Sequence, residues 1–295
     1  MPQVIKIGHA GLNVPDPDAA LAYYTDTLGL SEVDRGKGAV YLGSGADHHS
    51  VVLYTDGEPG LRQLAFQISA DRTLQDVLGE LRDRDIPAEL QHDAQPGIAE
   101  LIQIHDPQGN PVLLYSEVAQ VRHGFKDRGI VPHKLGHVAQ KVQNIDAMVA
   151  FYRDVLGFRE SDWMEHFFVF LRCGPDHHTV NFISSPRRGM HHIAFELRDW
   201  SHVESASDLL AQRGIPLIWG PGRHGIGHNI FAYHHDPAAN IVELFTELDV
   251  VLNEELGAFE PRPWHEDFPQ RTKVWQFSPT AANKWGILPP EGFME

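Results

Sequence analysis

Apolar residues recur at helical spacing in one stretch near the middle of the chain, at Met148, Phe151, Tyr152, Val155 and Leu156. The pattern stops at Gly157, a residue suited to the C-terminal cap of a helix. Residues 134–142 before it read as a strand, and the runs HFFVFLRC and HTVNFI after it read as short strands. This order predicts a β-α-β-β-β module.

The same order of elements follows a second time. It begins with the strand HHIAFEL, continues with a helix over residues 201–213 and ends in a hairpin around DPAAN. The modules are roughly 60 residues long, a length that leaves room for one helix and four short strands. The pattern predicts an α+β fold built from tandem βαβββ modules.

The modules of the first half are echoed in the second half. The segment HAGLNVPDPDAALAYYTDTLGL from His9 matches HVAQKVQNIDAMVAFYRDVLGF from His137 without a gap, and DHHSVVLY matches DHHTVNFI. Such a repeat predicts two homologous domains, residues 1–120 and 130–250. Residues 251–295 are rich in Pro and Trp and have no counterpart in the first copy. We expect this tail to pack near the active site of the second domain.

Composition narrows the range of partners. The chain has 295 residues, of which 42% are hydrophobic and 22% charged, and its formal net charge is −16. This charge argues against binding to nucleic acid or to an anionic membrane, because both would repel it, and favours a small-molecule ligand. The N-terminal residues do not resemble a secretion signal, and the single cysteine, Cys173, forms no intrachain disulfide. We therefore expect a cytoplasmic protein.

The repeat acts as an internal control for function, because both copies must fold but only one needs to carry out chemistry. The copies share His9 and His137, whereas Gln63 is replaced by His192 and Leu113 by Glu243. The second copy therefore offers two histidines and a glutamate where the first offers a histidine, a glutamine and a leucine. We expect the first domain to be a metal-free scaffold and the second to be catalytic.

Strand alternation places these side chains. In HHIAFEL, His192 faces away from the apolar set that begins with Ile193. Glu243 shares its strand face with Ile241 and Phe245, and an unpaired carboxylate there would be strongly disfavoured. Two imidazoles and one carboxylate form the facial triad that suits non-haem Fe(II), and Mn(II) accepts the same ligands. The pattern predicts a metal site at His137, His192 and Glu243.

The segment RHGIGHNIFAYHHDPAANIVELF, together with the duplicated modules, resembles the two-domain extradiol dioxygenases of the vicinal oxygen chelate superfamily, the catechol 2,3-dioxygenase type. The resemblance covers about residues 3–250 and implies a pair of glyoxalase-like domains. It assigns the metal ligands to His137, His192 and Glu243, and catalytic roles to His178, His224 and Tyr233. Ala232 and Ala239 depart from the family pattern, which puts the local loop shape in doubt.

The resemblance implies a reaction and a cofactor. An Fe(II) enzyme, with Mn(II) as the alternative, inserts the co-substrate O2 into a catechol ring and gives a 2-hydroxymuconic semialdehyde type of product in aromatic compound degradation. His178, titrating near neutrality, serves as the acid–base group. Tyr233 bonds a substrate oxygen, with His224 beside it. Such enzymes are commonly homo-oligomers, often tetramers.

Two other functions stay open on the same scaffold. One is a glyoxalase-like isomerase or a hydrolase that uses a divalent metal as a Lewis acid. The other is a metal-free small-molecule binding protein. His177, His191 and His228 border the predicted site, and the sequence leaves their roles open.

The sequence does not identify the substrate. Aromatic residues that could line an apolar pocket are Phe170, Trp219, Trp264, Trp275 and Trp285. Arginines that could instead bind a substrate carboxylate are Arg223, Arg262 and Arg271.

Overall fold

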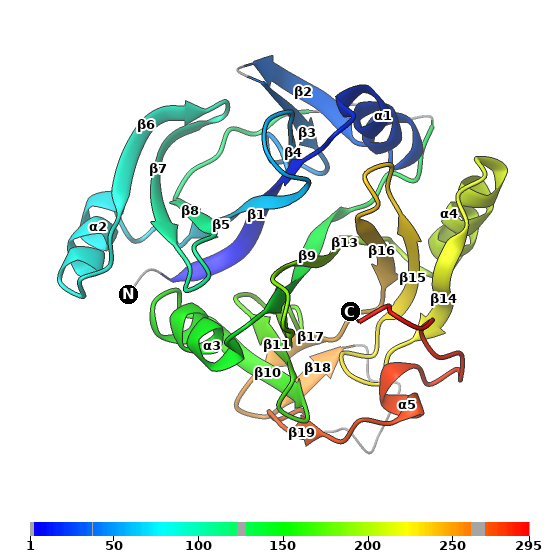
Figure 1. Ribbon diagram of the computed structural model, residues 1–295. Helices are drawn as coiled ribbons and strands as arrows, with labels where there is room; N and C mark the ends of the chain where they lie inside the picture. Colours follow the sequence, from blue (N-terminus) through cyan, green and yellow to red (C-terminus); the bar gives the residue numbers. More distant parts are fainter. Residues whose placement is uncertain (1–2, 37, 123–127, 261–268, 295) are drawn as a thin grey trace. The chain divides into compact units, whose positions relative to one another are not determined.

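The computed structural model describes residues 3–36, 38–122, 128–260 and 269–294 (Figure 1). The chain forms two compact units. The first comprises residues 1–135 and 146–158, and the second comprises residues 136–145 and 159–295. Among the described residues, no helix has both the length and the apolar character needed to cross a membrane.

The first unit is built on an eight-stranded sheet in the order β2-β3-β4-β1-β5-β8-β7-β6. Its first module contains β1 (Val4–Asn13), α1 (Pro17–Ala22), the π-helical turn η1 (Tyr23–Thr27), β2 (Ser31–Gly36), β3 (Ala39–Gly43) and β4 (Val51–Tyr54). Its second module contains β5 (Gly60–Ile68), α2 (Leu74–Arg82), β6 (Glu89–Gln95), β7 (Ile98–His105) and β8 (Pro111–Tyr115). Side chains buried along these strands and on α2 form the core of this unit.

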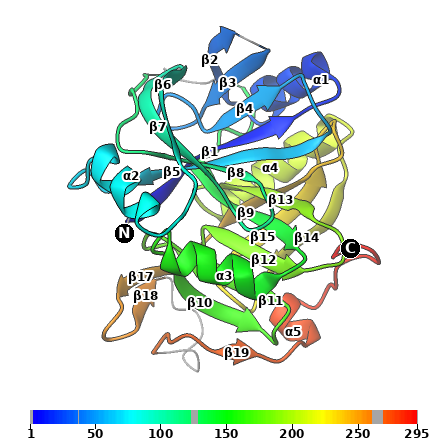
Figure 2. The ribbon, with the colours of Figure 1, turned by 60° about the vertical axis from the view of Figure 1, so that its left-hand side comes forward.

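The second unit repeats this topology in a nine-stranded sheet, in the order β14-β15-β16-β13-β9-β12-β11-β10-β19. Its strands and helix are β9 (Lys134–Val142), β10 (Arg159–Met164), β11 (Phe168–Arg172), β12 (Val180–Ser184), β13 (Gly189–Glu196), α4 (Trp200–Gln212), β14 (Leu217–Arg223), β15 (Ile230–His235) and β16 (Ile241–Thr246). The tail adds β17 (Val250–Asn253), β18 (Ala258–Glu260), β19 (Val274–Trp275) and α5 (Pro279–Ala282). Ala281 of α5 packs in one apolar cluster with Phe170 of β11, and Figure 2 shows α5 near the end of that strand.

The predicted βαβββ order is confirmed in all four modules. The strand expected at residues 134–142 is β9, and the helix expected at residues 201–213 is α4, shifted by one residue at each end. Gly157 has a φ of +79°, which suits the helix end proposed for it.

The hairpin residue Ala239 adopts a φ of +62°, and Gly109 in the first copy has a φ of +83°. The loop therefore keeps its left-handed turn although Ala239 carries a Cβ, at a cost of about 1 kcal/mol.

Helix α3 (Ile145–Asp154) belongs almost entirely to the first compact unit, although the repeat assigns it to the second copy. The ring of Tyr152 lies edge-on to those of Phe66 and Phe158, with centroids 6.1 and 5.2 Å away. Aromatic contacts of this kind stabilise a core beyond the area they bury. Burial of this helix thus depends on a strand, β5, of the other copy.

Candidate metal centre and substrate cavity

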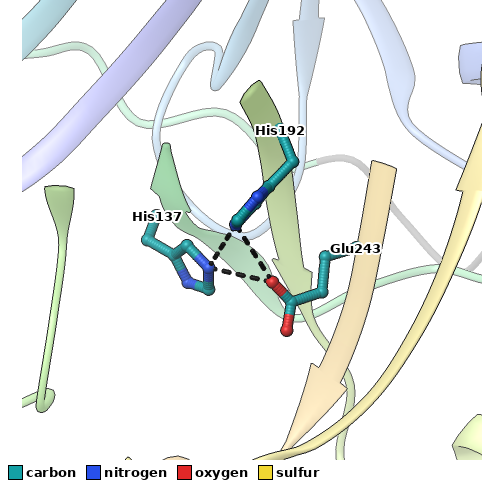
Figure 3. A group of neighbouring side chains, drawn as sticks. All are labelled: His137, His192 and Glu243. Atoms are coloured by element: carbon teal, nitrogen blue, oxygen red, sulfur yellow. Dashed lines mark hydrogen bonds and ion pairs between the residues drawn. The ribbon is translucent and has the colours of Figure 1, made fainter. Parts of the chain in front are cut away.

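Three strands of the second unit bring His137, His192 and Glu243 together. His137 lies on β9 and His192 on β13, the two strands at the junction of the modules, and Glu243 lies on β16, which pairs in parallel with β13. Nε2 of His137 is 3.1 Å from Nε2 of His192 and 3.0 Å from Oε2 of Glu243. The three side chains point toward one another (Figure 3). In the described part of the chain, this is the group of His, Cys, Asp or Glu side chains arranged to hold a metal ion.

Glu243 is a buried carboxylate, with only 1% of its surface exposed. Burial by itself would raise its pKa, but His137 and His192 outweigh this effect and hold the pKa of Glu243 well below the usual range. Burial lowers the pKa of His192, although Glu243 opposes this. The site therefore combines a carboxylate anion with neutral imidazole at His192, the protonation states that metal ligands need.

Asn229 orients the carboxylate from its other side. Its Nδ2 donates to Oε1 of Glu243 over 2.9 Å, and this leaves Oε2 directed at the histidines. Asn229 was not among the site residues expected from the sequence, although it lies inside the segment that carries the resemblance. An amide that binds one oxygen of a ligating carboxylate fixes the orientation of the other.

The hydrogen bonds of His192 fix its tautomer. The carbonyl oxygen of Phe293 can only accept, so Nε2–H of His191 donates to it over 2.8 Å. Nδ1 of His191 is then the acceptor for Nδ1–H of His192, 2.7 Å away. His192 therefore presents an unprotonated Nε2 to Oε2 of Glu243 at 3.2 Å. Nε2 of His137 lies within 3.1 Å of both acceptors, and a cation bound by all three atoms would remove the repulsion between them. The donor set therefore fits a divalent metal ion.

His224 and Tyr233 form a hydrogen-bonded pair beside the triad. Nδ1–H of His224 donates to the carbonyl oxygen of Ala282 over 2.8 Å, so its Nε2 accepts from the Tyr233 hydroxyl over 3.0 Å. Burial lowers the pKa of His224 to about 4. Burial, reinforced by Glu243, raises the pKa of Tyr233 well above 10. Tyr233 is therefore a neutral phenol whose proton is given to His224 and whose oxygen remains an acceptor.

His178 lies against the first ligand, with its ring centroid 4.3 Å from that of His137. Nε2–H of His177 donates to Oδ2 of Asp162 over 3.2 Å, and Nδ1 of His177 accepts from Nδ1–H of His178 over 3.0 Å. Burial, then His137 and His177, lowers the pKa of His178 well below 6.5. The expectation that His178 titrates near neutrality is therefore wrong. It is a neutral imidazole with an unprotonated Nε2.

These groups border a cavity of about 140 Å³. Its walls are mainly apolar, and they include Met164, Phe168, Phe170, Trp219, Ile226, Phe277 and Phe293. Among the described residues, Glu243 is the acidic lining residue, and no Lys or Arg lines the cavity. Asn181 also lines it, and its Oδ1 has no hydrogen-bond partner within the described residues. An apolar cavity of about 150 Å³ accepts a ligand the size of benzene, so a single ring fits here.

Of the aromatic residues considered from the sequence, Phe170 and Trp219 line this cavity. Trp275 instead packs behind the wall, against the cluster that contains Phe170. Trp285 is 47% exposed and lies edge-on to Trp200. Trp264 lies outside the described residues. The aromatic wall also contains residues that were not expected from the sequence, Phe167 and Phe168 and the tail residues Phe277 and Phe293.

The arginines considered as carboxylate ligands lie elsewhere. Arg223 is paired with Glu247 at 2.6 Å, and Arg271 donates to the carbonyl oxygens of Glu254 and Glu255. Arg262 lies outside the described residues. The two described arginines are therefore committed to other acceptors.

The matching place in the first unit holds no comparable donor set. Nε2 of His9 and Nε2 of Gln63 lie 3.5 Å apart, and Gln63 donates to the hydroxyl of Tyr54 over 3.1 Å. Burial, then the neighbouring His49, lowers the pKa of His9 well below 6.5. Leu113 supplies no ligand atom, so this site lacks the carboxylate that balances a cation.

Four buried histidines should make the metal-free protein sensitive to mild acid. Burial lowers the pKa of His49, His191 and His234 to about 3 and that of His224 to about 4. In the unfolded chain, imidazole titrates near 6.5, so only the unfolded chain takes up these protons as the pH falls from 6.5 toward 4.

The free energy of unfolding should therefore decrease over that range, by up to about 2 kcal/mol per histidine at pH 5. Urea unfolding of metal-free protein at pH 7, 6 and 5 measures it. A urea unfolding midpoint that does not change between pH 7 and pH 5 would contradict the assignment of these four histidines as buried and neutral.

Both halves of the sequence match one known protein family. The profile of the Glyoxalase/Bleomycin resistance protein/Dioxygenase superfamily matches residues 6–114 and 134–244. The chain belongs to this superfamily. The two matches fall on the two copies of the repeat, and the resemblance proposed from the sequence is confirmed.

Within the superfamily, the chain is similar to named ring-cleavage enzymes. It is 30% identical over 268 residues to a metapyrocatechase from Pseudomonas sp. (strain CF600), covering 82% of this chain and 86% of that protein. It is 24% identical over 298 residues to a manganese-dependent 2,3-dihydroxybiphenyl 1,2-dioxygenase from Geobacillus genomosp. 3, covering 92% of this chain and 94% of that one.

Among solved structures, the Mn(II)-bound glyoxalase from Novosphingobium aromaticivorans matches with a TM-score of 0.84 and 28% identity, covering 97% of this chain and 92% of that one. The tandem glyoxalase-like fold predicted from the sequence is confirmed.

Proposed function

We propose that this protein is an extradiol dioxygenase that inserts O2 into an uncharged catechol and gives a 2-hydroxymuconic semialdehyde type of product. The observation that carries this proposal is the convergence of His137, His192 and Glu243 in a cavity with apolar walls. The names of the metapyrocatechase and of the dihydroxybiphenyl dioxygenase support it. Aromatic compound degradation is the matching physiological role.

His137, His192 and Glu243 would hold Fe(II), or Mn(II), in this proposal. Such a metal, when bound, supplies a template for the catechol and O2 and a path for electron density between them. The chain contributes one negative charge, from Glu243, so part of the charge of a divalent ion remains to attract a deprotonated catechol oxygen. The apolar walls keep water away and strengthen this attraction.

His178 is the proposed acid–base group. Its unprotonated Nε2 can take a proton from a catechol hydroxyl, and Asp162 would stabilise the resulting charge through His177. The same proton can then be returned as the O–O bond breaks. The low pKa of His178 favours this return, because the protonated ring is a strong acid in this environment.

Tyr233 and His224 are the proposed groups that orient the substrate. The Tyr233 hydroxyl donates to His224, so its oxygen can accept a hydrogen bond from a catechol hydroxyl that keeps its proton. Stacking between the rings of Trp219 and Tyr233, at 5.4 Å, holds the phenol in place. This arrangement would distinguish the two oxygens of the substrate.

The cavity predicts selectivity against charged catechols. A substrate carboxylate would be buried near Glu243 without a described Lys or Arg in the lining, and an unpaired buried charge is strongly destabilising. We therefore expect kcat/KM for 4-methylcatechol to exceed that for 3,4-dihydroxybenzoate, which is nearly the same size, on the order of 100-fold.

Initial rates of oxygen uptake by metal-loaded protein test this selectivity. Faster turnover of the carboxylate would refute the substrate class. If the metal-loaded protein turns over neither of these compounds and does not turn over catechol itself, the proposed dioxygenase activity is refuted.

A glyoxalase-like isomerase is the second candidate, because the Mn(II)-bound structure similar to this chain is named a glyoxalase. An isomerase needs no oxygen. If catechol consumption stops under argon and resumes in air, the reaction with catechol needs oxygen and is not an isomerisation.

The remaining parts of the proposal concern the whole chain. Residues 1–120 are proposed as a metal-free scaffold, and residues 130–250 as the catalytic domain, with the tail 251–295 near its active site. The homo-oligomeric state and the cytoplasmic location stay predictions.

A further inference from the structure

The C-terminal residues 269–294, here called the tail segment, form hydrogen bonds with His191, Asp162 and His224. These three residues lead to the hydrogen bonds of His192, His178 and Tyr233. We propose that the tail segment fixes the tautomers of His192, His178 and His224, and that His191 is the positioning residue through which it acts on the metal ligand. This inference rests on the proposed metal site. It assigns a role to a segment that has no counterpart in the first copy.

The link to the metal ligand runs through His191. A neutral imidazole carries one proton, and in isolation the proton can sit on either nitrogen. The Phe293 carbonyl draws that proton to Nε2 of His191, at 2.8 Å, so Nδ1 of His191 must accept from His192, at 2.7 Å. Without this carbonyl, His191 can turn its proton toward His192. Nε2 of His192 would then carry a proton and could not bind a metal.

The link to His178 runs through Asp162. The backbone N–H of Lys273 donates to Oδ1 of Asp162 over 3.1 Å, and Nε2 of Gln270 donates to Oδ2 over 3.2 Å. The carboxylate held in this way accepts from His177, which in turn accepts from His178. The pairing of His177 and His178 repeats that of His191 and His192. In both, the first histidine of the doublet directs the second.

The third link is direct, because the Ala282 carbonyl accepts from Nδ1–H of His224. The tail segment is itself held at this place. Oδ1 of Asn283 accepts from the backbone N–H of Arg223 over 3.0 Å, and the carbonyl oxygen of Ile287 accepts from Nε1–H of Trp219 over 2.7 Å. Backbone carbonyls with fixed positions are suited to setting tautomers, since they accept protons but never donate them.

The linkage predicts a reciprocal effect. If the docked tail segment favours the metal-binding tautomer of His192, bound metal must favour the docked tail segment by the same free energy. Residues 287–294 should therefore exchange their amide hydrogens more slowly when metal is bound.

Variants of His191 in the full-length protein test the link. His191→Leu removes both hydrogen bonds of the ring. His191→Asn keeps an acceptor near the Nδ1 position for His192 but is too short to reach Phe293. Leu288→Ala is the matched control, because it shortens a side chain of the same tail segment that is 49% exposed and does not line the cavity. Electron paramagnetic resonance measures the Mn(II) affinity of each variant. Hydrogen exchange of the amides of residues 287–294 is recorded with and without Mn(II). Thermal unfolding of each metal-free variant measures its folding stability.

We expect His191→Leu to weaken Mn(II) binding by about 10- to 100-fold, and His191→Asn to weaken it less. In His191→Asn, Mn(II) should no longer slow exchange in the tail segment. Leu288→Ala should bind Mn(II) within about threefold of wild type, because the Phe293 carbonyl and the ring that anchors it are unchanged. The thermal unfolding temperatures of the metal-free variants show whether weaker Mn(II) binding is due to a general loss of folding stability.

A folded His191→Leu variant that binds Mn(II) as tightly as the wild type would overturn this inference. So would a wild-type tail segment whose amide exchange is the same with and without Mn(II). Neither result would contradict the metal site. A wild-type protein that binds no Mn(II) or Fe(II) would overturn the metal site itself.

Discussion

Replacing His192 with alanine is expected to abolish metal retention and to lower catechol turnover at least about 1000-fold, because one of the three ligands is lost. Oε2 of the buried Glu243 carboxylate would lose its contact with His192 and keep that with His137. Elemental analysis after anaerobic loading with Fe(II), together with oxygen uptake, measures the two effects. Metal content equal to that of the wild type would remove His192 from the site.

The first copy supplies the control for this substitution. Gln63→Ala changes the matching position, where the amide contacts His9 and Tyr54. We expect it to leave metal content unchanged and turnover within about twofold of wild type, since Gln63 and Leu113 offer neither an imidazole nor a carboxylate at the two matching ligand positions. A large loss in Gln63→Ala would show that both copies take part in the chemistry.

His178→Asn is expected to keep the metal but lower kcat by about 100- to 10,000-fold, the range typical of a lost acid–base group. Asparagine fills a similar volume and can still donate toward Nδ1 of His177, but it offers no basic nitrogen to the substrate. Stopped-flow absorbance separates binding of catechol under anaerobic conditions from the later turnover in air. An unchanged kcat would refute the role of His178.

A matched control again comes from the first copy. His49 occupies the place of His178, and its Nδ1 lies 3.1 Å from Nδ1 of His48. His49→Asn alters a similar histidine doublet away from the proposed chemistry. We expect its effect on kcat to stay within about twofold.

The repeat explains why so much of the site could be predicted from one sequence. Two copies of a scaffold share the residues that folding needs, so the changes from Gln63 to His192 and from Leu113 to Glu243 marked the residues with another purpose. Strand alternation placed Glu243 on an apolar face, where a carboxylate needs partners. The structure then brings His137 and His192 to within 3.2 Å of it.

Features that depend on contacts distant in the sequence could not be predicted. The apolar stripe of α3 predicts a buried helix, but it does not say which strands cover it, and the helix packs with Phe66 of the other copy. The tail has no regular apolar period, so nothing in its pattern places the carbonyl of Phe293 on His191. The tautomers, and the low pKa of His178, follow from these distant contacts and from burial.

The most direct test of the central proposal is oxygen uptake after anaerobic loading with Fe(II). Catechol is added under argon, air is admitted, and oxygen uptake is recorded together with the visible absorbance of the product. We predict one O2 consumed per catechol, a yellow ring-fission product, and neither signal in His192→Ala. Bound Fe(II) without oxygen uptake for any uncharged catechol would contradict the dioxygenase and favour the glyoxalase-like isomerase.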